Sequence, residues 1–118
     1  MINQNFAERF ARDWAASWND RDLDAIMAHY ADSIVFHSPR IKTVLGVERA
    51  TIEGKAALRD YWETALEAAP ELYFEIDTVL VSSDALTVLY TNHRDQQVAE
   101  TFVFDERLRV SRSIAAYG

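Results

Sequence analysis

The sequence predicts an α+β fold in which a curved, mixed but mostly antiparallel sheet wraps around three helices from the N-terminal half of the chain. Before Pro70, apolar residues recur at helical spacing. After Pro70 the period drops to two and stays there. At 118 residues and 13.5 kDa, the chain is expected to form one domain over residues 1–118. Helices followed by antiparallel strands favour a layer of helices on one sheet face, with a conical pocket between the layers.

The first helix carries an aromatic stripe. Asn5, followed three residues later by Glu8, resembles a capping box that would start this helix. Bulky aromatic residues then recur every four positions, at Phe6, Phe10, Trp14 and Trp18. Because a buried indole N–H needs an acceptor or a wet cavity, the two tryptophans are candidates for the pocket wall as well as for the core.

Shorter elements follow. Asp22 is placed to cap a second, short helix, and residues 34–39 read as a first strand stopped by Pro39. A further helix is expected from Lys55 to just before Pro70. The segment between them, residues 40–53, shows only a short β-prone piece at 50–52, and we expect it to form the rim or lid of the pocket.

Alternation defines the strands after Pro70. One inward face is predicted to hold Leu72, Phe74, Ile76, Thr78 and Leu80, and the next Leu86, Val88 and Tyr90. A final hairpin spans residues 97–116, around the turn 105–107. Its inward faces are predicted to be Val98, Glu100, Phe102 and Phe104 on one strand, and Leu108, Val110, Arg112 and Ile114 on the other.

Each inward face of the hairpin therefore carries one charge. A three-residue turn would place Glu100 opposite Arg112. Breaking a buried pair of this kind costs roughly 3–5 kcal/mol, so the two groups would meet as the polar floor of a pocket. The alternative is a cross-strand pair that only fixes the register of the strands. We keep both interpretations open.

Composition excludes several function classes. A net charge of −7 and a pI near 4.8 argue against nucleic acid or anionic membranes as partners. The chain has no cysteine, and the spacing of its three histidines suits no metal site. With only three glycines there is no glycine-rich phosphate loop, and no cofactor is expected. No signal peptide or membrane span is visible, so a cytoplasmic location is the expectation.

Four segments carry a resemblance to a known family: Trp18–Ile26, Tyr30–Asp32, the strand ending in Ser38-Pro39, and Glu53–Trp62. With the order of the later strands, these segments resemble the nuclear transport factor 2-like superfamily, in its SnoaL-like and ketosteroid-isomerase-like branch. The resemblance covers essentially the whole chain and implies a cone-shaped α+β fold. It does not fix a function, because the superfamily holds isomerases, dehydratases, epoxide hydrolases, polyketide cyclases and binding proteins.

The isomerase pattern carries over only in part. Its proton-shuttling aspartate falls on Ser38, and its tyrosine donor falls on or near Trp14. Its acidic oxyanion-hole position is retained in kind as Glu100, which in that family works because it is held neutral, a case that is itself a standard example of pKa tuning. Arg112 opposite Glu100 would keep the carboxylate ionised. Ketosteroid isomerisation is therefore not expected.

Two function classes follow. In the first, the cone binds a small apolar or aromatic molecule, and if it is an enzyme it performs cofactor-free isomerisation, dehydration or aldol-type cyclisation. Glu100 would be the base, and Arg112 would hold it. His37 is a further acid–base candidate, unless Ser38 faces the pocket and His37, as its neighbour in the strand, faces the other side of the sheet. The expected ligand-binding residues are Trp14, Trp18, Tyr30, Ser38, Trp62, Tyr90 and Phe102.

In the second class, the chain is a non-catalytic ligand-binding or assembly module that forms a homodimer through the outer sheet face. Small, β-prone residues alternate onto that face. The predicted set is Thr87, Leu89, Thr91, Ala99, Thr101, Val103, Ser111, Ser113 and Ala115. The homodimer is expected under either class.

Overall fold

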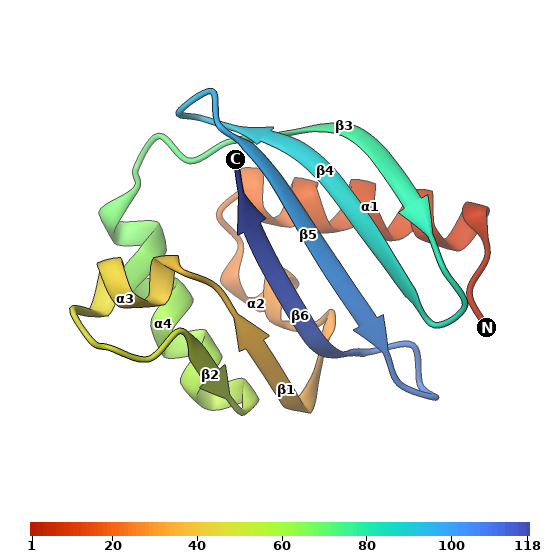
Figure 1. Cartoon of the computed structure of the whole chain (residues 1–118), viewed down its shortest axis with the longest axis horizontal. Helices are drawn as coiled ribbons and strands as arrows, with labels where there is room; N and C mark the ends of the chain where they lie inside the picture. Colours follow the sequence, from red (N-terminus) through yellow and green to blue (C-terminus); the bar gives the residue numbers. More distant parts are fainter.

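The computed structural model describes all 118 residues of the chain (Figure 1). The helices are α1 (Gln4–Asn19), α2 (Leu23–Met27), α3 (Arg40–Leu45) and α4 (Lys55–Ala68). The strands are β1 (Tyr30–His37), β2 (Thr51–Glu53), β3 (Phe74–Val81), β4 (Ala85–Asn92), β5 (Gln97–Phe104) and β6 (Val110–Tyr117). The α+β class is confirmed. None of the helices combines the length and the apolar character needed to cross a bilayer.

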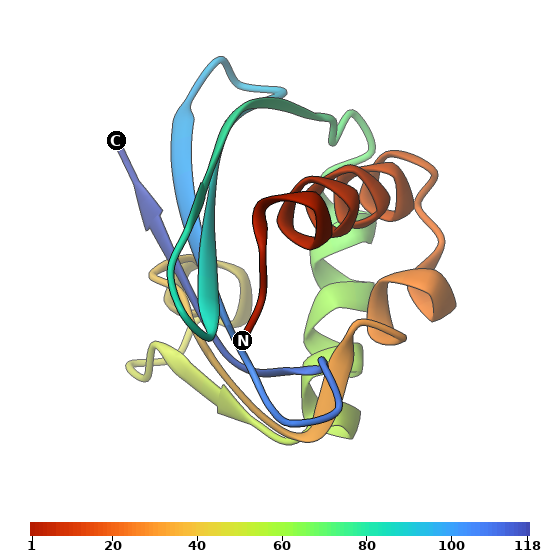
Figure 2. The same cartoon turned by 90° about the vertical axis from the view of Figure 1, so that its right-hand side faces the viewer.

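The six strands form one curved sheet in the order β2-β1-β6-β5-β4-β3. All neighbours are antiparallel except β1 and β6, which run parallel, so the predicted mixed sheet is confirmed. Figure 2 shows α1, α2 and α4 on the concave side, while no element covers the opposite face. One cluster of 26 buried residues fills the space between the sheet and the helices.

Helix α1 begins two residues earlier than predicted. Asn3, not Asn5, is the N-cap, and its side-chain oxygen accepts the backbone N–H of Phe6 at 2.9 Å. At the other end, the Asn19 side chain exchanges two hydrogen bonds with the backbone of Phe74, at 2.9 and 2.8 Å. This amide fixes the C-terminal end of α1 to the first residue of β3.

The segment between β1 and α4 contains an unpredicted helix. After Pro39 the chain forms α3, which ends at Gly46 in the left-handed conformation (φ 66°) that glycine adopts without steric cost. The β-prone piece at 50–52 corresponds to β2, which pairs with the end of β1 at the sheet edge. Asp22 caps α2 as predicted, with its carboxylate accepting the N–H of Ala25.

A register shift in β3 changes which residues face inward. The pairing of β3 with β4 shifts between Ile76 and Thr78. Before the shift Phe74 and Ile76 face the helices as predicted, but Thr78 and Leu80 turn outward, and Leu80 is 54% exposed. The prediction for these two side chains is wrong because a bulge reverses the alternation.

A second irregularity decides the geometry of the final hairpin. Its loop is longer than the predicted turn: Asp105 accepts the backbone N–H groups of Arg107 and Arg109, and Leu108 lies half-exposed with φ 59°. Phe104 therefore pairs with Val110, and the register then shifts, so that Val103 pairs with Arg112. From this point the inward and outward positions of β6 are the reverse of those predicted.

The predicted Glu100–Arg112 pair is consequently absent. Glu100 lies opposite Ala115, whereas Arg112 is exposed on the outer face. Ser113 and Ala115, expected outside, are buried, and Ile114, expected inside, is 38% exposed. Arg112 thus supplies neither a structural partner nor a charge for Glu100.

The bond between Asn19 and Phe74 gives a stability prediction. Asn19→Ala removes both hydrogen bonds and leaves the Phe74 N–H and C=O without the Asn19 side chain as partner. The free energy of unfolding should therefore fall by about 1–3 kcal/mol. Urea titration at equilibrium measures this loss. Asn5→Ala is the matched control, because Asn5 is exposed and its side chain makes no hydrogen bond. Equal stability of the two variants would contradict the prediction.

Candidate functional site

The candidate site is built around Glu100, at the centre of β5. The unbroken alternation of β5 turns this side chain toward the helices, where it is only 5% exposed. The Tyr90 hydroxyl donates to one carboxylate oxygen at 3.0 Å, and the Ser113 hydroxyl donates to the other at 3.4 Å. No Lys, Arg or His nitrogen lies within 4 Å of the carboxylate.

Burial without a cation changes the acidity of Glu100. Desolvation raises the pKa of this carboxyl group from 4.5 to about 7, against the smaller opposing effect of the hydrogen bonds from Tyr90 and Ser113. The expectation that Arg112 would keep it ionised is wrong. Near neutral pH the group populates both protonation states, which is the condition for a general acid or base.

Glu100 lines a narrow cavity of about 80 Å³ between the sheet and the helices. Most of its wall is aromatic or aliphatic, and few polar groups reach it. The lining residues are Trp14, Trp18, Phe36, Ser38, Arg40, Val44, Tyr61, Trp62, Ala65, Ala69, Leu72, Phe74, Tyr90, Asn92, His93, Glu100 and Tyr117. Ligand pockets usually measure about 300–1,000 Å³, so a larger ligand requires the wall to open.

Most of the predicted ligand-binding residues lie in this wall. Trp14, Trp18, Ser38, Trp62 and Tyr90 line the cavity, whereas Tyr30 and Phe102 do not. The last two are fully buried in the core instead. Tyr30 accepts the indole N–H of Trp14 at 3.1 Å, so the polar atoms of this pair satisfy one another.

The other two predicted catalytic residues lie outside the cavity. His37 precedes Ser38, faces the opposite side of the sheet, and its Nδ1 lies 3.4 Å from the Thr51 hydroxyl. Arg112 is on the outer face, as described above. The structure therefore joins only Glu100, among the three predicted catalytic groups, to the predicted pocket.

Sequence reasoning missed three polar groups of the wall. Arg40 was in the unassigned segment, and its guanidinium carbon lies 5.9 Å from the ring centre of Tyr117. His93 also lines the wall, and its Nδ1 is buried and lacks a hydrogen-bond partner. Tyr117 becomes visible only when the shifted period Ser113, Ala115, Tyr117 is known.

The tyrosines around Glu100 are held in their neutral form. Burial, with the neighbouring charge of Glu100, raises the pKa of Tyr90, so that its hydroxyl remains a hydrogen-bond donor. Burial and Glu100 also raise the pKa of Tyr117, although Ser38 and Arg40 act in the opposite direction. Burial also raises the pKa of Tyr61.

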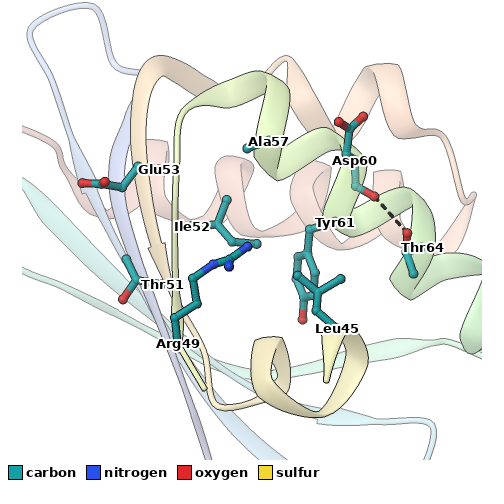
Figure 3. Close-up of a pocket in the computed structure, with 9 residues that line it drawn as sticks. All are labelled: Leu45, Arg49, Thr51, Ile52, Glu53, Ala57, Asp60, Tyr61 and Thr64. Carbon is teal, nitrogen blue, oxygen red and sulfur yellow. Dashed lines mark hydrogen bonds between the residues drawn. The ribbon is translucent and has the colours of Figure 1, made fainter. Parts of the chain in front are cut away.

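A second hollow lies outside the cavity, between α4 and the segment that joins α3 to β2 (Figure 3). It measures about 610 Å³ and is open, and its polar lining mixes Arg49 with Glu53 and Asp60. Tyr61 belongs to both walls and separates the two spaces. The inner cavity is the candidate site, because of the two it alone contains a buried carboxyl group, and burial raises the pKa of that group to about 7. No three His, Asp or Glu side chains gather closely enough to hold a metal ion.

The family-model comparison identifies the fold. The model of the SnoaL-like domain matches residues 11–112, which is most of the chain. The chain belongs to the SnoaL-like family. The superfamily resemblance predicted from the sequence is thereby confirmed. A comparison with curated proteins found no match for this chain.

Solved structures agree with this assignment. A SnoaL-like protein of unknown function from Burkholderia thailandensis is 36% identical, with a TM-score of 0.92 over 100% of this chain and 99% of that one. A putative polyketide cyclase from Sinorhizobium meliloti is 18% identical, with a TM-score of 0.74 over 90% and 92% of the two chains. A putative hydroxylase from Streptomyces galilaeus is also 18% identical, with a TM-score of 0.74 over 98% and 91%. The last two show a shared fold.

The raised pKa of Glu100 predicts a pH dependence of stability. The unfolded carboxyl ionises near 4.5 and the folded one near 7, so the folded state binds the extra proton between these values and the free energy of unfolding falls as pH rises. Above pH 7, where the buried carboxylate is ionised, its burial lowers the free energy of unfolding by about 3 kcal/mol. The free energy of unfolding of Glu100→Gln, relative to that of wild type, should therefore increase by about 3 kcal/mol as the pH is raised from about 4 to about 8.

Urea titrations of both proteins across this range measure that difference. Glu106→Gln is the control, because Glu106 is exposed in the loop before β6. If the stability difference between Glu100→Gln and wild type stays constant with pH, then Glu100 does not titrate between 4.5 and 7 in the folded protein.

Proposed function

We propose that this SnoaL-like domain binds a small apolar or aromatic molecule in the inner cavity and catalyses a cofactor-free proton transfer on it. The observation that carries this proposal is the carboxyl group of Glu100, which is buried in the wall of an aromatic cavity, has no Lys, Arg or His nitrogen within 4 Å and has a pKa of about 7. A carboxylate with a raised pKa is a stronger base than one in water, and near neutral pH both of its protonation states are populated.

The chemistry would begin at a carbon next to a carbonyl group of the ligand. The ionised Glu100 takes a proton from that carbon, the C–H electron pair moves into the carbonyl, and an enolate oxygen develops. The indole N–H of Trp18 is available to stabilise that oxygen, because it lines the cavity and has no partner. The protonated Glu100 then returns the proton to another carbon, or to a leaving hydroxyl group.

Isomerisation, dehydration and aldol-type cyclisation all share this first step. The putative cyclase and hydroxylase among the structural relatives support a role in small-molecule chemistry, although their likeness to this chain is one of fold. Ser38 and Trp14 still depart from the ketosteroid-isomerase pattern. The expectation that Glu100 is held ionised no longer applies, because Arg112 lies on the outer face of the sheet.

Proton exchange tests the proposal without knowledge of the natural substrate. Wild-type protein in deuterated buffer should catalyse exchange of the α-protons of small cyclic and aryl ketones, followed by NMR. Because Glu100 would be the base, Glu100→Gln should slow this exchange by at least about a hundredfold. Tyr90→Phe removes one hydrogen bond from the carboxylate and should change the pH profile of exchange while the reaction itself persists.

Arg112→Gln is the matched control. It removes a charge from the outer face of β6, outside the cavity, and should exchange protons at the wild-type rate. Exchange that persists in Glu100→Gln, or that fails equally in both variants, would overturn the proposed role of Glu100.

A non-catalytic homodimeric module is the second candidate, and the uncovered sheet face favours it. The Thr87 and Thr101 hydroxyls hydrogen-bond to one another there at 2.9 Å, beside small or β-branched neighbours, and Ile114 is exposed. Such a face suits packing against a second copy of the sheet. The narrowness of the cavity also favours a role that needs no substrate.

Sedimentation tests the dimer, which either function accommodates. Wild-type protein at micromolar concentration should sediment as a dimer, and Ile114→Lys should sediment as a monomer because it places a charge in the outer face. Leu108→Lys is the control: Leu108 is exposed to a similar degree but lies in the loop before β6. A monomeric wild type would overturn the dimer.

A further inference from the structure

Arg40 is the only Lys or Arg side chain in the wall of the inner cavity, as Glu100 is the only acidic one. The sequence brings it there through the unpredicted helix α3, of which Arg40 is the first residue. Its backbone N–H donates to the Ser38 hydroxyl at 3.2 Å, so both residues are fixed at the same point of the wall. Arg40 is half-buried, whereas Glu100 is 5% exposed. The cation therefore lies toward the mouth of the cavity and the acid at its floor.

No carboxylate of the protein neutralises Arg40. The two ion pairs of the structure join Arg59 to Asp24, and the N-terminal amine to Asp84. This is notable in a chain with a net charge of −7, because acidic side chains are abundant. Instead, the guanidinium lies 5.9 Å from the ring centre of Tyr117, which is within the range of a cation–π contact. That contact orients the guanidinium while its N–H groups remain free to bind an anion.

A second donor in the wall is also unused. The Trp18 side chain is 5% exposed, yet its indole N–H has no acceptor within the protein. Buried donors are normally paired, and an unpaired one in a cavity wall marks a place for a ligand or water oxygen. Arg40 and Trp18 come from different elements, α3 and α1, so the two donors define two separate points on any ligand that fills the cavity.

The free groups restrict the charge of the ligand. One cation favours one negative charge, and the buried carboxyl at the floor disfavours a second. The planar guanidinium matches the two oxygens of a carboxylate, which is also the smallest common organic anion and suits a cavity of about 80 Å³. The aromatic surfaces between the two ends suit a flat, apolar body, since Trp18, Trp62 and Phe74 all face the cavity.

We propose that the inner cavity is selective for small aromatic or conjugated monocarboxylic acids, whose carboxylate pairs with Arg40 at the mouth while the apolar body extends toward Glu100. This substrate class rests on the proposed function only in that it uses the same cavity. Arg40 is the residue that determines specificity, and the carboxylate it holds positions the carbon skeleton of the ligand against the acid at the floor.

Calorimetric titration with matched acids and amides tests this selectivity. The probes are benzoate and phenylacetate, with benzamide and phenylacetamide as neutral molecules of nearly the same shape. Wild-type protein should bind each acid at least about tenfold more tightly than its amide. Arg40→Met should weaken acid binding by at least about tenfold and leave amide binding unchanged, whereas Arg40→Lys should retain part of the preference because it keeps the charge.

Arg112→Met is the matched control, since it removes an exposed arginine outside the cavity and should leave both affinities unchanged. Circular dichroism confirms that each variant is folded before titration. The proposal is overturned if acids and amides bind wild type equally, if neither acid binds at about 10 mM, or if Arg40→Met binds acids as wild type does.

The two proposals fail in different experiments. Acid binding that depends on Arg40, without proton exchange that depends on Glu100, would overturn the proposed chemistry and leave the ligand class in place. Exchange that depends on Glu100, with no preference for acids over amides, would overturn the ligand class and leave the proposed chemistry in place.

Discussion

The burial of one carboxyl group without a cation is the constraint on which the rest of the site depends. A charged Glu100 in an apolar interior is costly, and the protein meets that cost with only two neutral donors, Tyr90 and Ser113. The remaining penalty appears as a raised pKa. A full ion pair would have lowered this penalty and lowered the pKa at the same time, because a neighbouring cation favours the ionised carboxylate.

The two donors come from strands on either side of β5, and this arrangement requires the unbroken register of β4 with β5 and the register shift between β5 and β6. Tyr90 reaches Glu100 from β4, and Ser113 reaches it from β6 only because the alternation of β6 reverses after Val110. The same reversal takes Arg112 out of the interior. One extra residue in β6 therefore exchanges a cation for a hydroxyl beside the carboxylate, which is the difference between an inert ion pair and a titratable group.

The features that could be predicted from the sequence are those that depend on residues close together in the chain. The aromatic stripe of α1, the Asp22 cap and the inward position of Glu100 all follow from uninterrupted local periods. The fold class followed from the same periods and from the family resemblance. The sequence did not show that the final loop is longer than three residues. The longer loop, in which Asp105 accepts the N–H groups of Arg107 and Arg109, and a tighter turn are both compatible with these residues. Arg40 could not be placed because the position of α3 depends on packing.

The parallel pairing of β1 with β6 has a consequence for how the chain reaches this state. Tyr30 pairs with Val110, so β1, the first strand of the chain, has the last strand, β6, as one of its two neighbours. Contacts between such distant segments carry a large loop-closure entropy and slow the folding of sheets that depend on them. Ser113 lies on that last strand, so Glu100 gains its hydrogen bond from Ser113 only in forms in which β6 is already paired with β5. A partly folded form in which β6 is still unpaired lacks this donor beside the carboxyl group.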